Sequence, residues 1–269
     1  MHSTLLGKRV HRMGISTHFG LGPDGVQAAM DRGLNYFWYV KSNMEAMTAP
    51  LRQRAQTDRD SLFIAGGPSF GFTGGQVKRG AERMLKQLGT DHLDLLQIFW
   101  VGKMSRASDG VLRAMEDLKA EGKCRGIGCS IHDRELAGEL ARERKVDVLM
   151  VRYNAGHPGA EADIFPHLGT GEDKVGVVTY TSTRWGTLLQ APKGWDDRPA
   201  KASECYRFAL TRPEVDVVLT GPASVAELDE NLQDMAQGAL DGQRQEWMRG
   251  LGRQARQSKA LQAFAFDGF

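Results

Sequence analysis

The feature that most constrains the fold is a repeated alternation of short apolar segments with amphipathic, helix-like segments. Residues 93–100 are almost continuously apolar, as expected of a strand that is buried on both faces. Strands that alternate with helices are joined by crossovers, so the pattern predicts an α/β fold with a parallel sheet. The expected strands lie at 11–16, 36–39, 62–65, 93–100, 124–131, 146–153, 175–180 and 215–219.

The pattern alone is compatible with two folds, a closed barrel and an open doubly wound sheet. No Gly-x-Gly-x-x-Gly motif follows the first expected strand, which counts against a Rossmann dinucleotide site. The 269 residues are close to the ~250 typical of one (β/α)8 barrel. No linker or low-complexity segment interrupts them, so we expect one domain over 1–269. Residues 4–10 indicate a hairpin before it, and 243–253 an extra amphipathic helix after it.

The charge balance favours neither nucleic acid nor a membrane as a partner. The formal net charge is +2, with 35 basic and 33 acidic residues. Residues 1–13 are basic but have no apolar centre, so they do not read as a secretory signal. No apolar run approaches the ~18 residues of a membrane span. We therefore expect a cytoplasmic protein; its oligomeric state stays open.

The cysteines and histidines do not form a metal-binding pattern. Cys124, Cys129 and Cys205 fit neither a zinc ribbon nor a redox CxxC pair, so reduced thiols are expected. The spacing of the histidines, with no carboxylate in register, is not that of metal ligands. The sequence therefore predicts no metal site.

Five segments, taken in chain order, form a recognisable series. They read Gly-Leu-Asn-Tyr-Phe at 33–37, Leu-Asp-Leu-Leu-Gln-Ile at 93–98, Gly-Ile-Gly-Cys-Ser at 126–130, Val-Thr-Tyr-Thr at 178–181 continuing to Gly186, and Gly221 with Ser224 and the pair Glu230-Asn231. Together they resemble the aldo-keto reductase superfamily along nearly the whole chain. The resemblance implies a (β/α)8 TIM barrel with NADPH bound in an extended form at the carboxyl ends of its strands.

The same resemblance implies carbonyl reduction by an Asp, a Tyr, a Lys and a His, but this chain departs from the pattern at all four positions. A Tyr with an ordinary pKa of ~10 is a poor acid near neutrality without its cationic neighbour. Residues that act as one catalytic unit also lose most of their effect together. We therefore expect ordinary carbonyl reduction to be absent or very slow. The four positions hold Trp38, Asn43, Gly67 and Phe99.

A shifted alignment could place Tyr39 or Lys41 in the catalytic positions. However, Tyr39 and Trp38 are neighbours in an expected strand, so Tyr39 should point to the opposite side. The replacements also agree with one another, because Trp38 and Phe99, with Trp100, would make an aromatic floor. An isolated Lys against that floor would be a costly buried charge.

The nucleotide site is half retained by the same resemblance. Tyr180 matches the aromatic residue that stacks on nicotinamide, and Ser130 matches a donor to its carboxamide. Ile131 and Met150 replace the other two carboxamide contacts. NAD(P)H binding is therefore left open. The remaining expected contacts are Thr181, Thr183, Arg184 and Gly186 at the pyrophosphate, and Gly221, Ser224, Glu230 and Asn231 at the adenine end.

Glu227 bears on the choice of nucleotide. It stands where many family members place a basic or amide residue near the 2′-phosphate, and Ala223 replaces another frequent Arg. A carboxylate there would repel a 2′-phosphate, which favours NADH over NADPH if either binds. Glu227 also has a second explanation, as the partner of Ser224 in a capping box.

Other polar residues follow expected strand ends and are candidates for a replacement acid/base set: His132, Tyr153 and His157. The alternative is that such loops are polar anyway, and that His157, between Gly156 and Pro158, shapes a turn. Phe264, Phe266 and Phe269 in the tail could close over a cleft.

Three functional classes therefore remain. The first is an atypical NAD(P)-dependent oxidoreductase. The second is a ligand-binding or regulatory pseudoenzyme with a small molecule in an aromatic pocket. The third is a barrel repurposed for non-redox acid/base chemistry.

Overall fold

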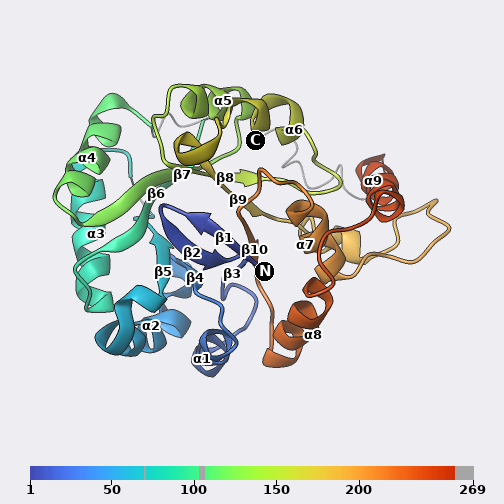
Figure 1. The fold of residues 1–269 in the computed structure, drawn as a ribbon, viewed down its shortest axis with the longest axis horizontal. Helices are drawn as coiled ribbons and strands as arrows, with labels where there is room; N and C mark the ends of the chain where they lie inside the picture. Colours follow the sequence, from blue (N-terminus) through green and yellow to red (C-terminus); the bar gives the residue numbers. More distant parts are fainter. Residues whose placement is uncertain (70, 103–106, 258–269) are drawn as a thin grey trace.

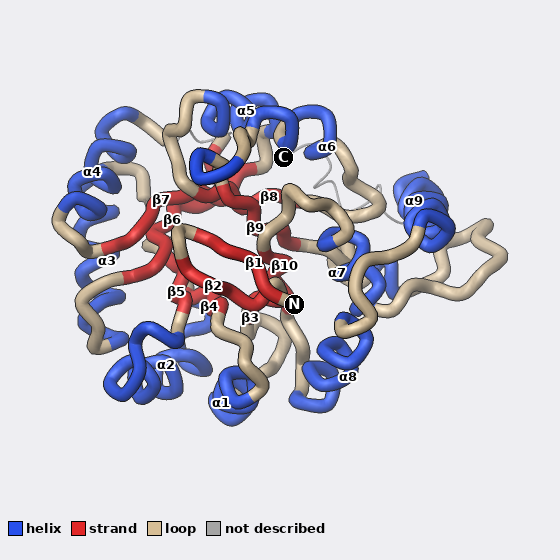
Figure 2. The backbone as a smooth tube through the Cα atoms, in the orientation of Figure 1, coloured by secondary structure: helices blue, strands red, loops and turns tan. Residues whose placement is uncertain are grey.

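The computed structural model describes residues 1–69, 71–102 and 107–257. Its centre is a closed parallel barrel in the order β10-β3-β4-β5-β6-β7-β8-β9, which confirms the barrel and excludes the open sheet. Figure 1 looks along this barrel, and Figure 2 shows its strands surrounded by helices. The barrel strands are β3 (Met13–Ile15), β4 (Tyr36–Tyr39), β5 (Phe63–Gly66), β6 (Leu93–Val101), β7 (Cys124–Ile131), β8 (Val148–Arg152), β9 (Gly176–Tyr180) and β10 (Val217–Thr220).

The expected hairpin is present and closes one end of the barrel. It consists of the antiparallel strands β1 (His2–Leu5) and β2 (Lys8–His11), which lie across the ring in Figure 1. Leu6 and Gly7 take positive φ angles of 51° and 72°, as a tight two-residue hairpin turn requires. Leu5 and Val10 are buried in the inner core beside Tyr36, so the hairpin seals this end of the barrel.

The helices pack around the barrel, and the extra C-terminal helix is confirmed as α9. The sequence around 161–167 predicts one helix, but the structure has a short helix and a separate 3-10 turn (Phe165–His167) there. Pro166 lacks an N–H and so cannot continue the α-helical bonds. The helices are α1 (Pro23–Asp31), α2 (Met44–Asp58), α3 (Gly74–Leu88), α4 (Asp109–Ala120), α5 (Arg134–Arg142), α6 (Ala160–Asp163), α7 (Ala202–Leu210), α8 (Val225–Met235) and α9 (Gly242–Gln257).

Two helices begin at residues whose side chains cap the backbone. Thr73 and Gln76 exchange both bonds of a capping box at α3. At α8, Ser224 accepts from the backbone N–H of Glu227, but the Glu227 carboxylate accepts from Ala223 at 2.8 Å, one residue earlier than a capping box requires. Glu227 therefore supports the start of α8 without completing the predicted box.

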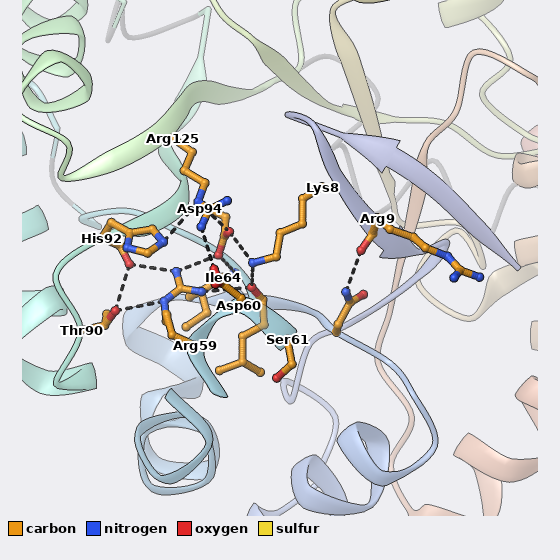
Figure 3. A network of polar contacts seen from close by, with 12 residues as sticks. Lys8, Arg9, Arg59, Asp60, Ser61, Ile64, Thr90, His92, Asp94 and Arg125 are labelled. Carbon is orange, nitrogen blue, oxygen red and sulfur yellow. Dashed lines mark hydrogen bonds and ion pairs between the residues drawn. The ribbon is translucent and has the colours of Figure 1, made fainter. Parts of the chain in front are cut away.

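Asp94 organises the hairpin end of the barrel, as Figure 3 shows. It is fully buried and accepts from Lys8 at 3.0 Å, from Arg59 at 2.8 Å and from the backbone N–H of Ile64 at 2.8 Å. Burial lowers the pKa of Lys8, and the Asp94 charge opposes that effect. Removing one partner of a buried ion pair is costly, so the pair of Asp94 on β6 with Lys8 on β2 stabilises the contact between β6 and the hairpin.

Two further aspartates repeat this arrangement around the same end of the barrel. Asp147 accepts from the backbone N–H of Ile127, and Asp216 from that of Val177, both at 2.8 Å. Each is also paired with a lysine. In barrels of this type, such residues at the amino ends of the strands serve stability rather than chemistry.

None of the described helices is both long and apolar enough to cross a membrane.

Candidate functional site

Two adjoining cavities lie at the carboxyl ends of the barrel strands. The first, the β9–β10 cavity, has a volume of about 460 Å³ and runs between the ends of β9 and β10 and helices α7 and α8. The second, the aromatic cavity, has a volume of about 470 Å³ and is lined by Trp38, Phe99, Trp100, Tyr180, His18, His132, Ser130, Met150, Val40, Lys41, Ser42 and Ser69. Both cavities are lined by His18, Trp38, Met150 and Tyr180, so these residues form a shared wall.

The aromatic cavity is built from inward-facing residues of β4 and β6. The rings of Trp38 and Phe99 meet edge to face at 5.7 Å, at an interplanar angle of 86°. Tyr39 points to the other side of β4, where its hydroxyl lies 2.8 Å from that of Thr48 in α2. This confirms the opposite facing of Trp38 and Tyr39, and it leaves Tyr39 outside the cavity.

Trp100 lies at the mouth of the aromatic cavity rather than in its floor. It is 54% exposed and has a φ of 56°, and the pairing of β6 with β7 shifts register between Ile98 and Val101. Such an irregularity re-aims a side chain at the end of a strand. The expectation that Trp100 belongs to the floor is therefore corrected.

Gly67 follows β5, and its position has no room for a side chain. An added Cβ would lie 1.7 Å from the carbonyl oxygen of Gln97 on β6. Any other residue at 67 therefore requires the backbone to move. Asn43 ends the 3-10 turn Lys41–Asn43, and its side chain lies outside the described parts of the structure.

Three residues singled out from the sequence meet in the aromatic cavity: Ser130, His132 and Tyr180. The Tyr180 hydroxyl lies 3.2 Å from Nδ1 of His132, and the two rings are edge to face at 5.9 Å. Burial lowers the pKa of His132, with a smaller contribution from Arg152. Burial also raises the pKa of Tyr180. Both groups are therefore neutral near pH 7.

His18 is a site residue that the sequence reasoning missed. Its two ring nitrogens are hydrogen-bonded to the hydroxyls of Ser16 and Ser42, and its ring lies 5.2 Å from that of Trp38. Burial lowers the pKa of His18 below its usual value. The available signal was its place just beyond the first strand, because loops at the carboxyl ends of barrel strands form the site.

Six of the residues predicted to hold nucleotide line the β9–β10 cavity. A seventh, Ser130, lines the aromatic cavity. Ser182, which was not predicted, also lines the β9–β10 cavity; its hydroxyl is buried and has no hydrogen-bond partner within the described residues. Glu227 lines the same cavity. The six are Tyr180, Thr181, Thr183, Gly186, Gly221 and Asn231.

The structure places the other three predicted contacts elsewhere. Arg184 is buried, and it reaches His157 at 3.5 Å and the carbonyl of Ala255 in α9 at 3.4 Å. Ser224 caps α8, and Glu230 is exposed and 3.4 Å from Lys201. None of the three lines either cavity. Arg184 and Ser224 are used by packing and capping contacts that only the fold reveals, and Glu230 by an exposed ion pair.

Tyr153 and His157, two of the predicted acid/base candidates, make contacts elsewhere in the fold. Tyr153 is fully buried, donates to Glu161 at 2.6 Å and stacks on Phe208 at 5.8 Å. His157 forms a β-bridge with Asn154 and contacts Arg184, which is the turn-shaping role that the sequence left open. Neither residue lines the two cavities.

Within the described ranges, no three His, Cys, Asp or Glu side chains gather closely enough to hold a metal ion. Cys124, Cys129 and Cys205 are buried free thiols. Burial raises the pKa of Cys129 to about 12, so it is unreactive near neutrality. Phe264, Phe266 and Phe269 lie outside the described residues.

Comparison with known proteins agrees with this architecture. The chain is 23% identical to L-galactose dehydrogenase of Arabidopsis thaliana, over 77% of this chain and 75% of that protein. It is 33% identical to methylglyoxal reductase YeaE of Escherichia coli K12, over 40% of this chain and 39% of that protein. The holo form of aldo-keto reductase AKR11C1 from Bacillus halodurans superposes with a TM-score of 0.77 at 19% identity, covering 93% and 95% of the two chains. A model of the Aldo/keto reductase family matches residues 25–204, and the chain belongs to that family.

Proposed function

We propose that this protein binds a nicotinamide dinucleotide in the β9–β10 cavity and a small flat molecule in the aromatic cavity. We further propose that it is an atypical oxidoreductase whose ordinary carbonyl reduction is absent or very slow. One observation carries the proposal: the two cavities meet at a shared wall that contains Tyr180. A nicotinamide ring stacked on Tyr180 would face the aromatic cavity.

The residues of the β9–β10 cavity fit such a cofactor. The buried Ser182 hydroxyl has no partner among the described residues, so a polar ligand there would satisfy it. Thr183 and Gly186 follow in the same loop, and Gly186 has a φ of 81° with open space where a Cβ would stand. When bound, the cofactor would supply a hydride. Tyr180 and Ser130 would orient its nicotinamide end.

The preference for NADH over NADPH rests on Glu227. Its carboxylate lines the β9–β10 cavity near the start of α8, next to Ala223. A 2′-phosphate in this region would meet a negative charge instead of a cation. Glu227 is also bonded to the backbone of Ala223, so its position is held.

The absence of ordinary carbonyl reduction rests on the four replaced positions. Trp38 and Phe99 fill the wall of the aromatic cavity with rings, and Gly67 stands where a side chain would collide with β6. These replacements leave no Tyr, Lys or Asp at the family's positions to deliver a proton. The titratable groups that line the aromatic cavity are Lys41, Tyr180, His132 and His18. Burial lowers the pKa of both histidines.

The four replaced positions and the aromatic cavity also support a second candidate, a ligand-binding or regulatory protein that holds cofactor without turnover. The collision at Gly67 favours it, because a Lys at this position would require the backbone to move. For the third candidate, non-redox acid/base chemistry, the remaining acid/base residues are His132 and His18. Tyr153 and His157 line neither cavity.

Calorimetric titration of the protein with NADH and NADPH tests cofactor binding. We expect saturable binding of NADH that is tighter than that of NADPH. Tyr180→Ala should weaken it by about tenfold through lost stacking, whereas Tyr180→Phe retains the ring and serves as the matched control. Absence of heat with either nucleotide would refute the cofactor half of the proposal.

A further inference from the structure

A third cavity, the basic cavity, adjoins the aromatic cavity on the side of α2 and α3. Its volume is about 460 Å³. Lys41 and Ser69 line both cavities, so the two are neighbours at the same end of the barrel. Arg79, Arg83 and Gln87 of α3 also line the basic cavity.

The charges that line this cavity are all of one sign. Lys41, Arg79 and Arg83 contribute three cations, and no Asp or Glu is among the lining residues. Within the described parts of the chain, none of the three forms an ion pair. Lys78, on the same helix, does find a carboxylate, Asp117, at 2.8 Å. The basic cavity therefore differs from the neighbouring surface of α3.

The arrangement of these cations suits a small oxyanion. Arg79 and Arg83 are four residues apart on α3, so they lie on one face about one turn apart. A like-charge pair at this spacing is mildly destabilising unless an anion lies between its members. Guanidinium groups bind carboxylate and phosphate through paired hydrogen bonds.

Gln87 supplies a second observation at the same place. Its side-chain amide oxygen is buried and has no hydrogen-bond partner among the described residues. The amide is therefore not held by a hydrogen bond to this oxygen. The cavity thus offers three cations beside one amide whose oxygen is unpartnered.

We infer that the ligand of this protein is an organic anion, with its ring in the aromatic cavity and its carboxylate or phosphate on Lys41, Arg79 and Arg83. The placement of the ring rests on the proposed function. The placement of the charge rests on the basic cavity alone. Lys41 and Ser69, which line both cavities, lie where the two sites adjoin.

Isothermal titration with three probes of one shape tests this inference: 2-naphthoate, 2-naphthyl phosphate and the neutral 2-naphthamide. We expect at least one of the two anions to bind at least tenfold more tightly than the amide. The anion whose affinity exceeds that of the amide by the larger factor identifies the charged group that the site prefers. The double variant Arg79→Gln/Arg83→Gln should abolish the gain and leave amide binding unchanged.

A control variant of equal charge separates a specific site from the general field of the protein. Lys86→Gln/Arg113→Gln removes two exposed cations that do not line the basic cavity, and the gain should persist in it. Equal binding of all three probes to the unaltered protein would overturn the inference and leave the proposed function standing. Failure of all three to bind would contradict the ligand cavity of the proposed function, and this inference with it.

Discussion

The hydroxyl of Tyr180 lies 3.2 Å from Nδ1 of His132, at the wall where the β9–β10 cavity meets the aromatic cavity. The sequence singles out the two residues for different reasons, one as a nicotinamide platform and one as an acid/base candidate. The structure brings them into one contact. Because burial shifts the pKa of each group away from neutrality, the contact joins two uncharged partners.

This contact predicts how His132 titrates. Its pKa is lowered by burial, so the imidazole should be neutral at pH 7 and take up a proton only below its ordinary pKa of about 6.5. Side-chain NMR of the histidines between pH 4 and 8 measures this, with the signal assigned by its loss in His132→Gln. A midpoint above 6.5 would show that a negative charge, absent from this account, faces the ring.

The collision at Gly67 predicts a large cost for the smallest side chain. Gly67→Ala should destabilise the protein by about 3 kcal/mol or more, because the new methyl group meets backbone rather than a movable side chain. Urea denaturation measures the change. Gly110→Ala in α4 is the matched control, since a Cβ there meets nothing within 4 Å, and its cost should be small. Equal costs at both positions would refute the collision.

The buried ion network predicts a contrast between two aspartates. Asp94→Asn should cost about 3–5 kcal/mol, because it leaves Lys8 and Arg59 without their buried partner. Asp60→Asn breaks the exposed pair with Arg125 at 3.0 Å and should cost less than ~1 kcal/mol. Measuring the free energy of unfolding of each variant tests this contrast. A small loss for Asp94→Asn would mean that the network is not what holds the hairpin to β6.

Glu227 predicts a change of nucleotide preference. Glu227→Arg replaces the carboxylate in the β9–β10 cavity by a cation, and it should improve NADPH affinity about tenfold while changing NADH affinity little. Glu230→Arg makes the same change one turn along α8, outside the cavity, and should leave the ratio of the two affinities near that of the unaltered protein. An equal shift in both variants would attribute the effect to overall charge.

The sequence was a good guide to the barrel because periodicity reports which faces are buried. It located the strands, the hairpin and the extra helix α9. Asn35 and Asp94, two of the residues behind the family resemblance, hold the hairpin end together: Asn35 accepts from the backbone of His11 at 2.8 Å. The family resemblance could therefore be recognised in part from residues that stabilise the fold.

The site was less predictable, since its contacts join residues far apart in the chain. His18 contacts Ser42 of the 3-10 turn after β4, and Arg184 lies outside the cavity and contacts Ala255 in α9. Tyr153 is buried in the core, where its hydroxyl donates to Glu161. Nothing in the local pattern around these residues distinguishes a side chain that faces the cavity from one that packs behind it.

The central claim is that the cofactor is held while ordinary carbonyl reduction is not performed. The most direct test follows NADH absorbance with a simple aldehyde such as 4-nitrobenzaldehyde, at a nucleotide concentration that calorimetry shows to be saturating. This account predicts no NADH oxidation above that of a buffer blank. Turnover near the ~10 s⁻¹ typical of enzymes would contradict it.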